Sequence, residues 1–182
     1  VPGALVSVIC VNALNRSVRE FELTDPAKIL DKTRELVIAT FEQGEHEVND
    51  GMDISLCALN KKTNQLQWSG ANNPLWIVRE NELIVLKPIK QPIGKYTIQK
   101  PFITHQIDLM EGDVLYMFSD GFQDQFGGPK GKKYKTANFK KLLLSINENS
   151  PSNQKQIIES TFHDWKGELE QIDDVCIVGI NI

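Results

Sequence analysis

The chain has 182 residues, about the length of one domain of roughly 150 residues. It carries 20 basic and 24 acidic residues, for a net charge of −4, and 41% of its residues are hydrophobic. These values are ordinary for a folded domain and argue against a disordered tail, a collagen-like fibre or a disulfide scaffold. The lack of a basic excess that could neutralise phosphates also argues against a general nucleic-acid-binding protein.

The three cysteines, Cys10, Cys57 and Cys176, are far apart, and each is flanked by apolar residues. No CxxC pair is present, which argues against a zinc site built from neighbouring cysteines. We expect free thiols, buried as small apolar groups, in a reducing compartment. No segment approaches the ~18 apolar residues of a membrane span, and no signal segment opens the chain. A cytoplasmic location is expected, although the parent protein could be anchored in a membrane through other domains.

The first two predicted elements are helices. Apolar residues over 4–19 recur at a spacing that suits a buried helix. Asp25 is a good N-cap and Pro26 suits the first helical position, so a second helix is predicted from there to near Gly44.

After residue 51 the pattern changes to short apolar runs separated by turn residues, which is typical of β-strands. The connecting loops are short, so antiparallel hairpins are predicted. The three predicted hairpins pair residues 52–59 with 65–69, 76–79 with 83–86, and 104–109 with 114–119.

The C-terminal part is predicted to contain a solvated loop rich in glycine and lysine, then two helices and a strand. These elements span residues 127–135, 136–146, 152–166 and 175–180. The loop lacks the G-x-x-x-x-G-K-[ST] spacing of a phosphate loop. Helices and antiparallel strands are thus segregated along the chain, which indicates an α+β layered fold.

Two acidic sites lie where predicted strands end or begin. Asp120 follows an apolar strand, and the pair Asp173-Asp174 directly precedes the last one. Carboxylates gathered at rigid strand ends repel one another unless a cation joins them, and hard oxygen ligands suit Mg²⁺ or Mn²⁺. The same residues are common in turns and solvated loops, so spacing alone leaves both interpretations open.

Five segments, in the same order, carry a resemblance to the bacterial metal-dependent protein phosphatases of the SpoIIE/RsbU type, in the PP2C-like superfamily. They are residues 1–5 (VPGAL), 49–54 (NDGMDI), 69–74 (SGANNP), 118–121 (FSDG) and 171–175 (QIDDV). The resemblance extends over the whole chain, with Asn72 standing where His is common in the family. It implies a four-layer α-β-β-α sandwich of two antiparallel sheets with helices on both outer faces.

The resemblance also implies an activity, which is hydrolysis of phosphoserine or phosphothreonine in a protein. Two ions, Mn²⁺ or Mg²⁺, activate the attacking water in that family. Asp120 and Asp173 match metal-binding aspartates, Gly121 a turn beside the metal, and Asp174 a residue that supports the ligands rather than binding the ion. Asp50 and Asp53 lie in a matching strand, but we interpret them as structural or peripheral.

The start of the chain affects these expectations. Residues 1–5 resemble the segment just after the Asp-x-x-Gly-His-Gly motif of the family. We therefore expect residues 1–182 to be a single phosphatase domain, an N-terminally truncated fragment of a longer protein that lacks its N-terminal strands and first metal-binding aspartate.

The implied partner is a phosphorylated regulatory protein of the anti-sigma-factor-antagonist type, in bacterial signalling, with sensor domains upstream in the parent protein. No contact of this domain with nucleic acid or a membrane is expected. The alternative is a non-catalytic signalling or docking module that keeps the fold with an incomplete metal site. A nucleotide or sugar phosphatase, which would share the metal chemistry, is a third possibility.

Overall fold

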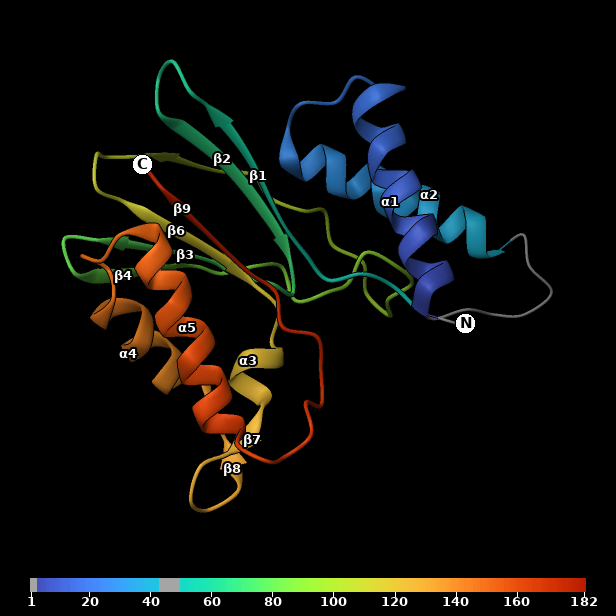
Figure 1. Ribbon diagram of the computed structural model, residues 1–182. Coiled ribbons are helices and arrows are strands. Elements are labelled where there is room, and N and C mark those ends of the chain that lie inside the picture. Colours follow the sequence, from blue (N-terminus) through green and yellow to red (C-terminus); the bar gives the residue numbers. More distant parts are fainter. Residues whose placement is uncertain (1–2, 43–49) are drawn as a thin grey trace. The chain divides into compact units, whose positions relative to one another are not determined.

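The computed structural model describes residues 3–42 and 50–182. The chain forms two compact units, between which it passes more than once. Unit 1 comprises Val1–Leu75 and Lys87–Leu109, and unit 2 comprises Trp76–Leu86 and Met110–Ile182. Each unit contains an antiparallel sheet and a pair of longer helices, which are labelled in Figure 1.

Unit 1 consists of two helices and a three-stranded sheet in the order β1-β2-β5. Its elements are α1 (Gly3–Arg19), α2 (Pro26–Glu42), β1 (Ile54–Asn60), β2 (Gln65–Ala71) and β5 (His105–Asp108). The central strand β2 pairs with β1 from Ile54↔Ala71 to Asn60↔Gln65. The predicted start of α2 is confirmed, because the Lys28 N–H donates to Asp25 Oδ1 at 3.0 Å.

The helix predicted near the N-terminus is confirmed, but the expectation that it is buried is wrong. The residues of α1 that are buried are Cys10, Ala13 and Ser17, whereas Leu5, Val8 and Val11 are 50%, 65% and 56% exposed. Apolar residues lie around more of this helix than one packed face can cover. The covered face meets α2, where Ser17 Oγ and Thr33 Oγ1 lie 3.1 Å apart.

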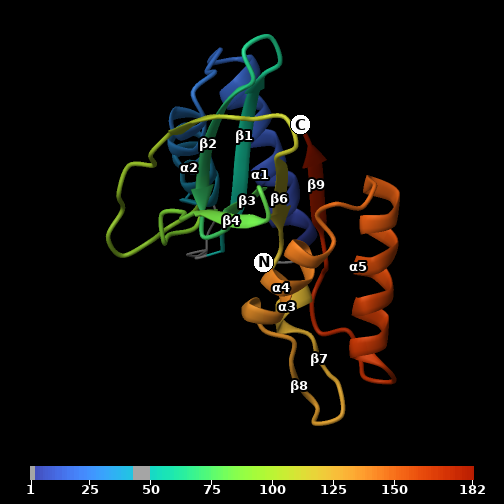
Figure 2. The ribbon, with the colours of Figure 1, turned by 90° about the vertical axis from the view of Figure 1, so that its left-hand side faces the viewer.

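Unit 2 contains the second sheet, in the order β4-β3-β6-β9. Its strands are β3 (Leu75–Arg79), β4 (Glu82–Leu86), β6 (Val114–Phe118) and β9 (Ile177–Asn181). Its other elements are the one-turn helix α3 (Gly121–Asp124), a small hairpin of β7 (Phe126–Gly127) and β8 (Lys132–Lys133), and the helices α4 (Thr136–Ser145) and α5 (Pro151–Lys166). Figure 2 shows α5 running alongside β9, with the β7–β8 hairpin beyond α3.

An aromatic core holds unit 2 together between its sheet and its helices. Trp76, Phe118 and Phe139 pack with ring centroids 4.6 to 5.7 Å apart, and Phe122 lies 4.8 Å from Phe139. Phe118 and Phe122 are both buried, at 5% and 1% exposure. They lie two residues before and two residues after Asp120, so the core anchors the backbone on both sides of that aspartate.

The first two predicted hairpins are confirmed, as β1–β2 and as β3–β4. Glu80 and Asn81 both have positive φ, 47° and 62°, which suits the two-residue turn between β3 and β4.

The third predicted hairpin is wrong, because β5 pairs with β2 whereas β6 pairs with β3 and β9. The Leu109 N–H bonds to Asn64 O, which keeps the end of β5 in the first sheet. The turn that follows is closed by Asp113, which accepts a hydrogen bond from the Met110 N–H. A short loop here carries the chain from one sheet to another rather than joining paired strands.

The predicted α+β class with antiparallel sheets is confirmed, as are the helices now seen as α4 and α5 and the last strand. The helix α3 and the β7–β8 pair were not predicted. The described residues, which include all three cysteines, contain no disulfide bond, as expected, but only Cys10 is buried. Cys57 is half-buried and Cys176 is exposed, so the expectation of burial is wrong for Cys176. Among the described residues, no helix has the length and apolar character needed to cross a membrane.

Candidate active site

Asp120 lies at the junction between β6 and α3. Its backbone carbonyl accepts a hydrogen bond from the Asp124 N–H at 3.0 Å, which begins the single helical turn. Its side chain makes no capping hydrogen bond to that turn. The carboxyl group is thus held at a strand end by a rigid backbone without being used to cap the helix.

Asp173 lies in the irregular segment between α5 and β9. This segment is exposed and contains no helix or strand. Local contacts fix its backbone, because the Asp174 N–H donates to Asp173 Oδ1 at 2.7 Å and Gln171 Nε2 donates to Asp173 O at 2.8 Å.

The structure brings Asp120 and Asp173 together. Although the Asp120 side chain is exposed, partial desolvation raises the pKa of its carboxyl group, and the adjacent carboxyl of Asp173 raises that pKa further. The charge of Asp124 acts in the same direction. The carboxyl group of Asp173 thus disfavours the ionised form of Asp120, and a cation bound beside Asp120 would favour that form.

Ser119 joins the two segments that carry these aspartates. Its hydroxyl donates to Asp174 O at 2.8 Å and accepts from the Cys176 N–H at 2.9 Å. Its backbone N–H also bonds to Cys176 O at 2.9 Å. Hydrogen bonds therefore connect the residue after β6 to the segment that precedes β9, directly beside Asp120.

Gly121 permits a close approach at the same place. A Cβ atom at this position would lie 2.5 Å from Asp174 O, closer than real contacts allow. The structure thus places Gly121 against Asp174, next to the two aspartates. The part of Asp174 that makes these contacts is its backbone carbonyl, which also accepts the hydrogen bond from Ser119.

The donor chemistry of this pair fits a hard divalent cation. Carboxylate oxygens are the ligands that Mg²⁺ and Mn²⁺ prefer. The described residues form no group of three or more His, Cys, Asp or Glu side chains able to hold a metal ion. A pair of carboxylates could supply only part of a coordination sphere, which Mg²⁺ commonly completes with several waters.

The similarity of this chain to a known protein family extends over its whole length. The model described as Stage II sporulation protein E (SpoIIE) matches residues 1–182. The chain belongs to the SpoIIE family.

Solved structures of SpoIIE-type and related phosphatases share this fold. The SiaA-PP2C domain of Pseudomonas aeruginosa superposes with a TM-score of 0.88 at 25% identity, over 100% of this chain and 71% of that one. A structure of the PP2C phosphatase domain of SpoIIE from Bacillus subtilis, with a fragment of its regulatory domain, gives 0.75 at 16% identity, over 98% and 50%. The RsbU and RsbW domains of a Mycobacterium tuberculosis protein give 0.72 at 18% identity, over 99% and 48%.

The expected resemblance to SpoIIE/RsbU-type phosphatases is thus confirmed, and the chain has the fold of a PP2C-type phosphatase domain. A comparison with curated protein sequences finds no significant match.

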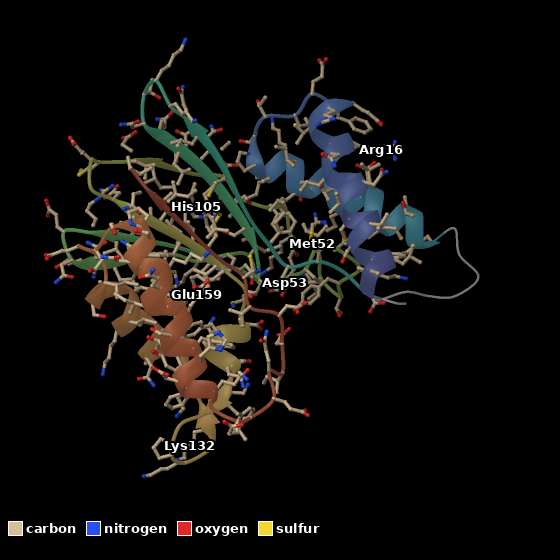
Figure 3. The ribbon with its side chains drawn as sticks, in the orientation of Figure 1. Arg16, Met52, Asp53, His105, Lys132 and Glu159 are labelled. Atoms are coloured by element: carbon tan, nitrogen blue, oxygen red, sulfur yellow. The ribbon has the colours of Figure 1, made fainter. Side chains whose placement is uncertain are left out.

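The other candidate residues belong to unit 1 or lie outside the described residues. Asp53, labelled in Figure 3, belongs to unit 1 and accepts a hydrogen bond from Asn72 Nδ2 at 2.8 Å. His105 packs against the buried Trp68, with ring centroids 5.4 Å apart. His46 lies outside the described residues.

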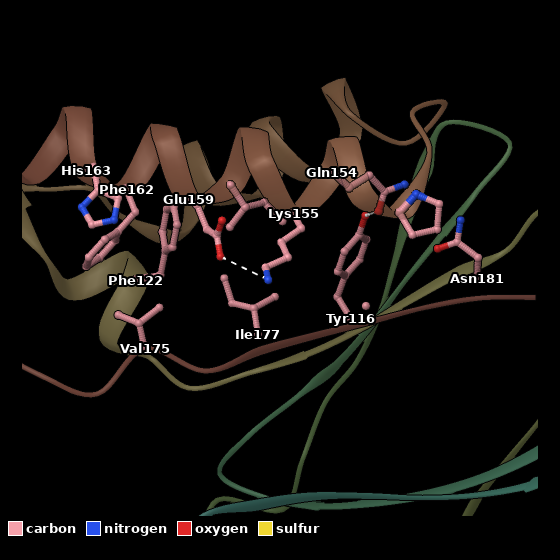
Figure 4. A pocket seen from close by; sticks show the side chains of 13 residues that line it. Tyr116, Phe122, Gln154, Lys155, Glu159, Phe162, His163, Val175, Ile177 and Asn181 are labelled. Carbon is pink, nitrogen blue, oxygen red and sulfur yellow. Dashed lines mark hydrogen bonds and ion pairs between the residues drawn. The ribbon is translucent and has the colours of Figure 1, made fainter.

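A separate pocket of about 430 Å³ lies between α5 and β9 (Figure 4). Its walls are largely apolar and include Tyr116, Phe122 and Ile177. Lys155 and Glu159 also line it, with Lys155 Nζ 3.7 Å from Glu159 Oε1. Neither Asp120 nor Asp173 lines this pocket, so it is not the candidate active site.

Proposed function

We propose that this protein hydrolyses phosphoserine or phosphothreonine in a regulatory protein, with Mn²⁺ or Mg²⁺ as cofactor. The observation that carries the proposal is that the carboxyl group of Asp173, in the segment between α5 and β9, lies next to that of Asp120, between β6 and α3. Membership of the SpoIIE family and the PP2C fold support the same activity. The substrate we propose is a small phosphorylated regulator of the anti-sigma-factor-antagonist type, in cytoplasmic signalling.

Each residue of the site has a defined task in this proposal. Asp120 and Asp173 bind the ions through their carboxylate oxygens. Ser119 and Gly121 keep the Asp173 segment against the end of β6, through the hydrogen bond to Asp174 O and the close approach described above. When bound, the ions supply an activated water and neutralise charge on the phosphoryl oxygens.

Phosphate release from a phosphoserine protein by the full-length protein tests this function. Asp120→Asn and Asp173→Asn should each reduce the Mn²⁺-stimulated rate by about 100-fold or more, since metal ions contribute several kcal/mol to such reactions. The matched control is Asp164→Asn, an exposed carboxylate on α5, which should leave the rate unchanged. A full rate in the Asp120→Asn protein would refute its assignment as a ligand.

A second candidate is a signalling or docking module that keeps the fold without catalysis. It is favoured by one observation, namely that the described residues supply two facing carboxylates rather than a larger ligand group. Calorimetric titration with Mn²⁺ separates the two functions. The enzyme should bind the ion, whereas the docking module should show neither binding nor phosphate release.

A further inference from the structure

Gln125 is a buried polar residue that follows α3, with 0% of its surface exposed. Its side-chain Nε2 donates to Phe126 O at 3.0 Å and to Glu170 O at 2.8 Å. Its Oε1 accepts from the Ile172 N–H at 3.4 Å. The side-chain amide is therefore fully used, and two of its partners belong to the exposed segment that carries Asp173.

The backbone of Gln125 is fixed as well. Its carbonyl oxygen accepts hydrogen bonds from the Tyr134 N–H and from Trp165 Nε1, each at 3.0 Å. The first bond comes from the chain leaving the β7–β8 hairpin, and the second comes from the last turn of α5. Since its anchor points lie in ordered elements, Gln125 is a rigid support for the segment that it holds.

Two residues, Gln125 and Ser119, hold the segment between α5 and β9 by hydrogen bonds, and they do so on opposite sides of Asp173. Gln125 holds Glu170 and Ile172 on the N-terminal side, and Ser119 holds Asp174 and Cys176 on the C-terminal side. Residues 170–174 are exposed and irregular, and the next residue that packs against the core is the partly buried Val175. Ordering such backbone costs conformational entropy, which fixed hydrogen bonds must offset.

We propose that Gln125 is a positioning residue, which holds the Asp173 carboxylate in place beside Asp120 and thereby sets the affinity of the site for Mn²⁺ or Mg²⁺. This inference rests on the proposed function. It accounts for a buried amide in a place where an apolar side chain would otherwise be favoured. Residues that orient metal ligands in this way typically change metal affinity by about 10–100-fold when they are replaced.

The chain offers a matched control within the same unit. Gln154 is also buried, at 4% exposure, and its amide likewise holds a connecting segment. It accepts a hydrogen bond from the Tyr116 hydroxyl and donates to Asn147 O and Asn149 O, between α4 and α5. None of these partners lies in the segment that carries Asp173.

The experiment compares Gln125→Met with Gln154→Met in the full-length protein, by calorimetric titration with Mn²⁺. Methionine keeps the size of the side chain and removes the amide in both. Gln125→Met should weaken Mn²⁺ binding by about tenfold, the lower end of the range for such orienting residues. Gln154→Met should leave the affinity within twofold, even where it lowers the melting temperature.

Hydrogen exchange gives a readout that does not depend on the metal. Without Mn²⁺, the amides of residues 170–174 should exchange faster in Gln125→Met than in the wild type, and at the wild-type rate in Gln154→Met. If Gln125→Met fails to fold, Gln125→Asn replaces it. That variant keeps a buried amide but is one methylene too short to reach Glu170.

The outcomes separate the two proposals. A wild-type protein that binds no Mn²⁺ would refute the metal-dependent function, while the exchange measurement would still test whether Gln125 holds residues 170–174. Unchanged Mn²⁺ affinity in the Gln125 variant, with a wild type that binds, would overturn the positioning role. An equal loss of affinity in the Gln154 variant would also overturn it, because the effect would then be global.

Discussion

The strand β6 has an aspartate beside each end, and the two have opposite surroundings. Asp113, just before the strand, is 1% exposed. It forms a bidentate ion pair with Arg79, whose Nε and Nη2 donate to its two carboxylate oxygens at 2.8 and 2.6 Å. Asp120, two residues after the strand, is exposed and faces the carboxyl of Asp173.

The pKa values of the two aspartates shift in opposite directions. Burial alone would raise the pKa of Asp113, but the hydrogen bonds from Arg79 and from the Met110 N–H outweigh it and lower that pKa. The pKa of Asp120 is raised by partial desolvation and by Asp173. One end of β6 therefore carries a carboxylate whose charge is balanced within the fold. The other carries a carboxyl group whose charge the described fold opposes, as expected where an external cation binds.

The largest effect on stability is expected from replacing Asp113, whose charge is balanced by Arg79. Asp113→Ala leaves the Arg79 guanidinium without its bidentate partner and the Met110 N–H without its acceptor. Breaking a buried ion pair in this way typically costs about 3–5 kcal/mol of unfolding free energy. Urea denaturation measures the loss. The matched control is Glu111→Ala, an exposed residue of the same turn, which should change stability by no more than about 0.5 kcal/mol.

A smaller effect is expected from pH, because protonation neutralises Asp113 without removing it. Its folded-state pKa is lowered, so its contribution is complete above the unfolded-state pKa of about 3.9 and is lost as pH falls through the folded-state value. Wild-type stability should therefore decline below about pH 4 more steeply than that of Asp113→Asn. Urea midpoints measured across this range check the slope. Parallel curves would show that another carboxylate dominates the acid sensitivity.

Much of the fold was predictable where neighbouring residues determine the structure. Asp25 and Pro26 mark the start of α2 through local capping, and the apolar run 114–118 identifies β6. The position of Asp120 at a strand end followed from that run.

The rest depends on contacts between residues far apart in the chain, which local patterns do not encode. Arg79, which makes Asp113 structural, lies 34 residues before it, and Gln125 reaches a partner 45 residues away. The pairing of β5 with β2 rather than with β6 has the same origin. The exposed face of α1 was mispredicted because periodicity shows that a helix forms and not how much of it is covered.

The smallest effect on stability is expected at Asp120, and it is the sharpest test of the contrast along β6. Asp120→Asn keeps the shape of the side chain and removes a charge that lies against Asp173. Because the group is exposed and makes no capping bond to α3, the unfolding free energy in the presence of a chelator should change by no more than about 0.5 kcal/mol. Any change should favour the folded state, since a like-charge contact is relieved. A loss of several kcal/mol, as at Asp113, would mean that Asp120 supports the fold, and the contact with Asp173 would then be no guide to a metal site.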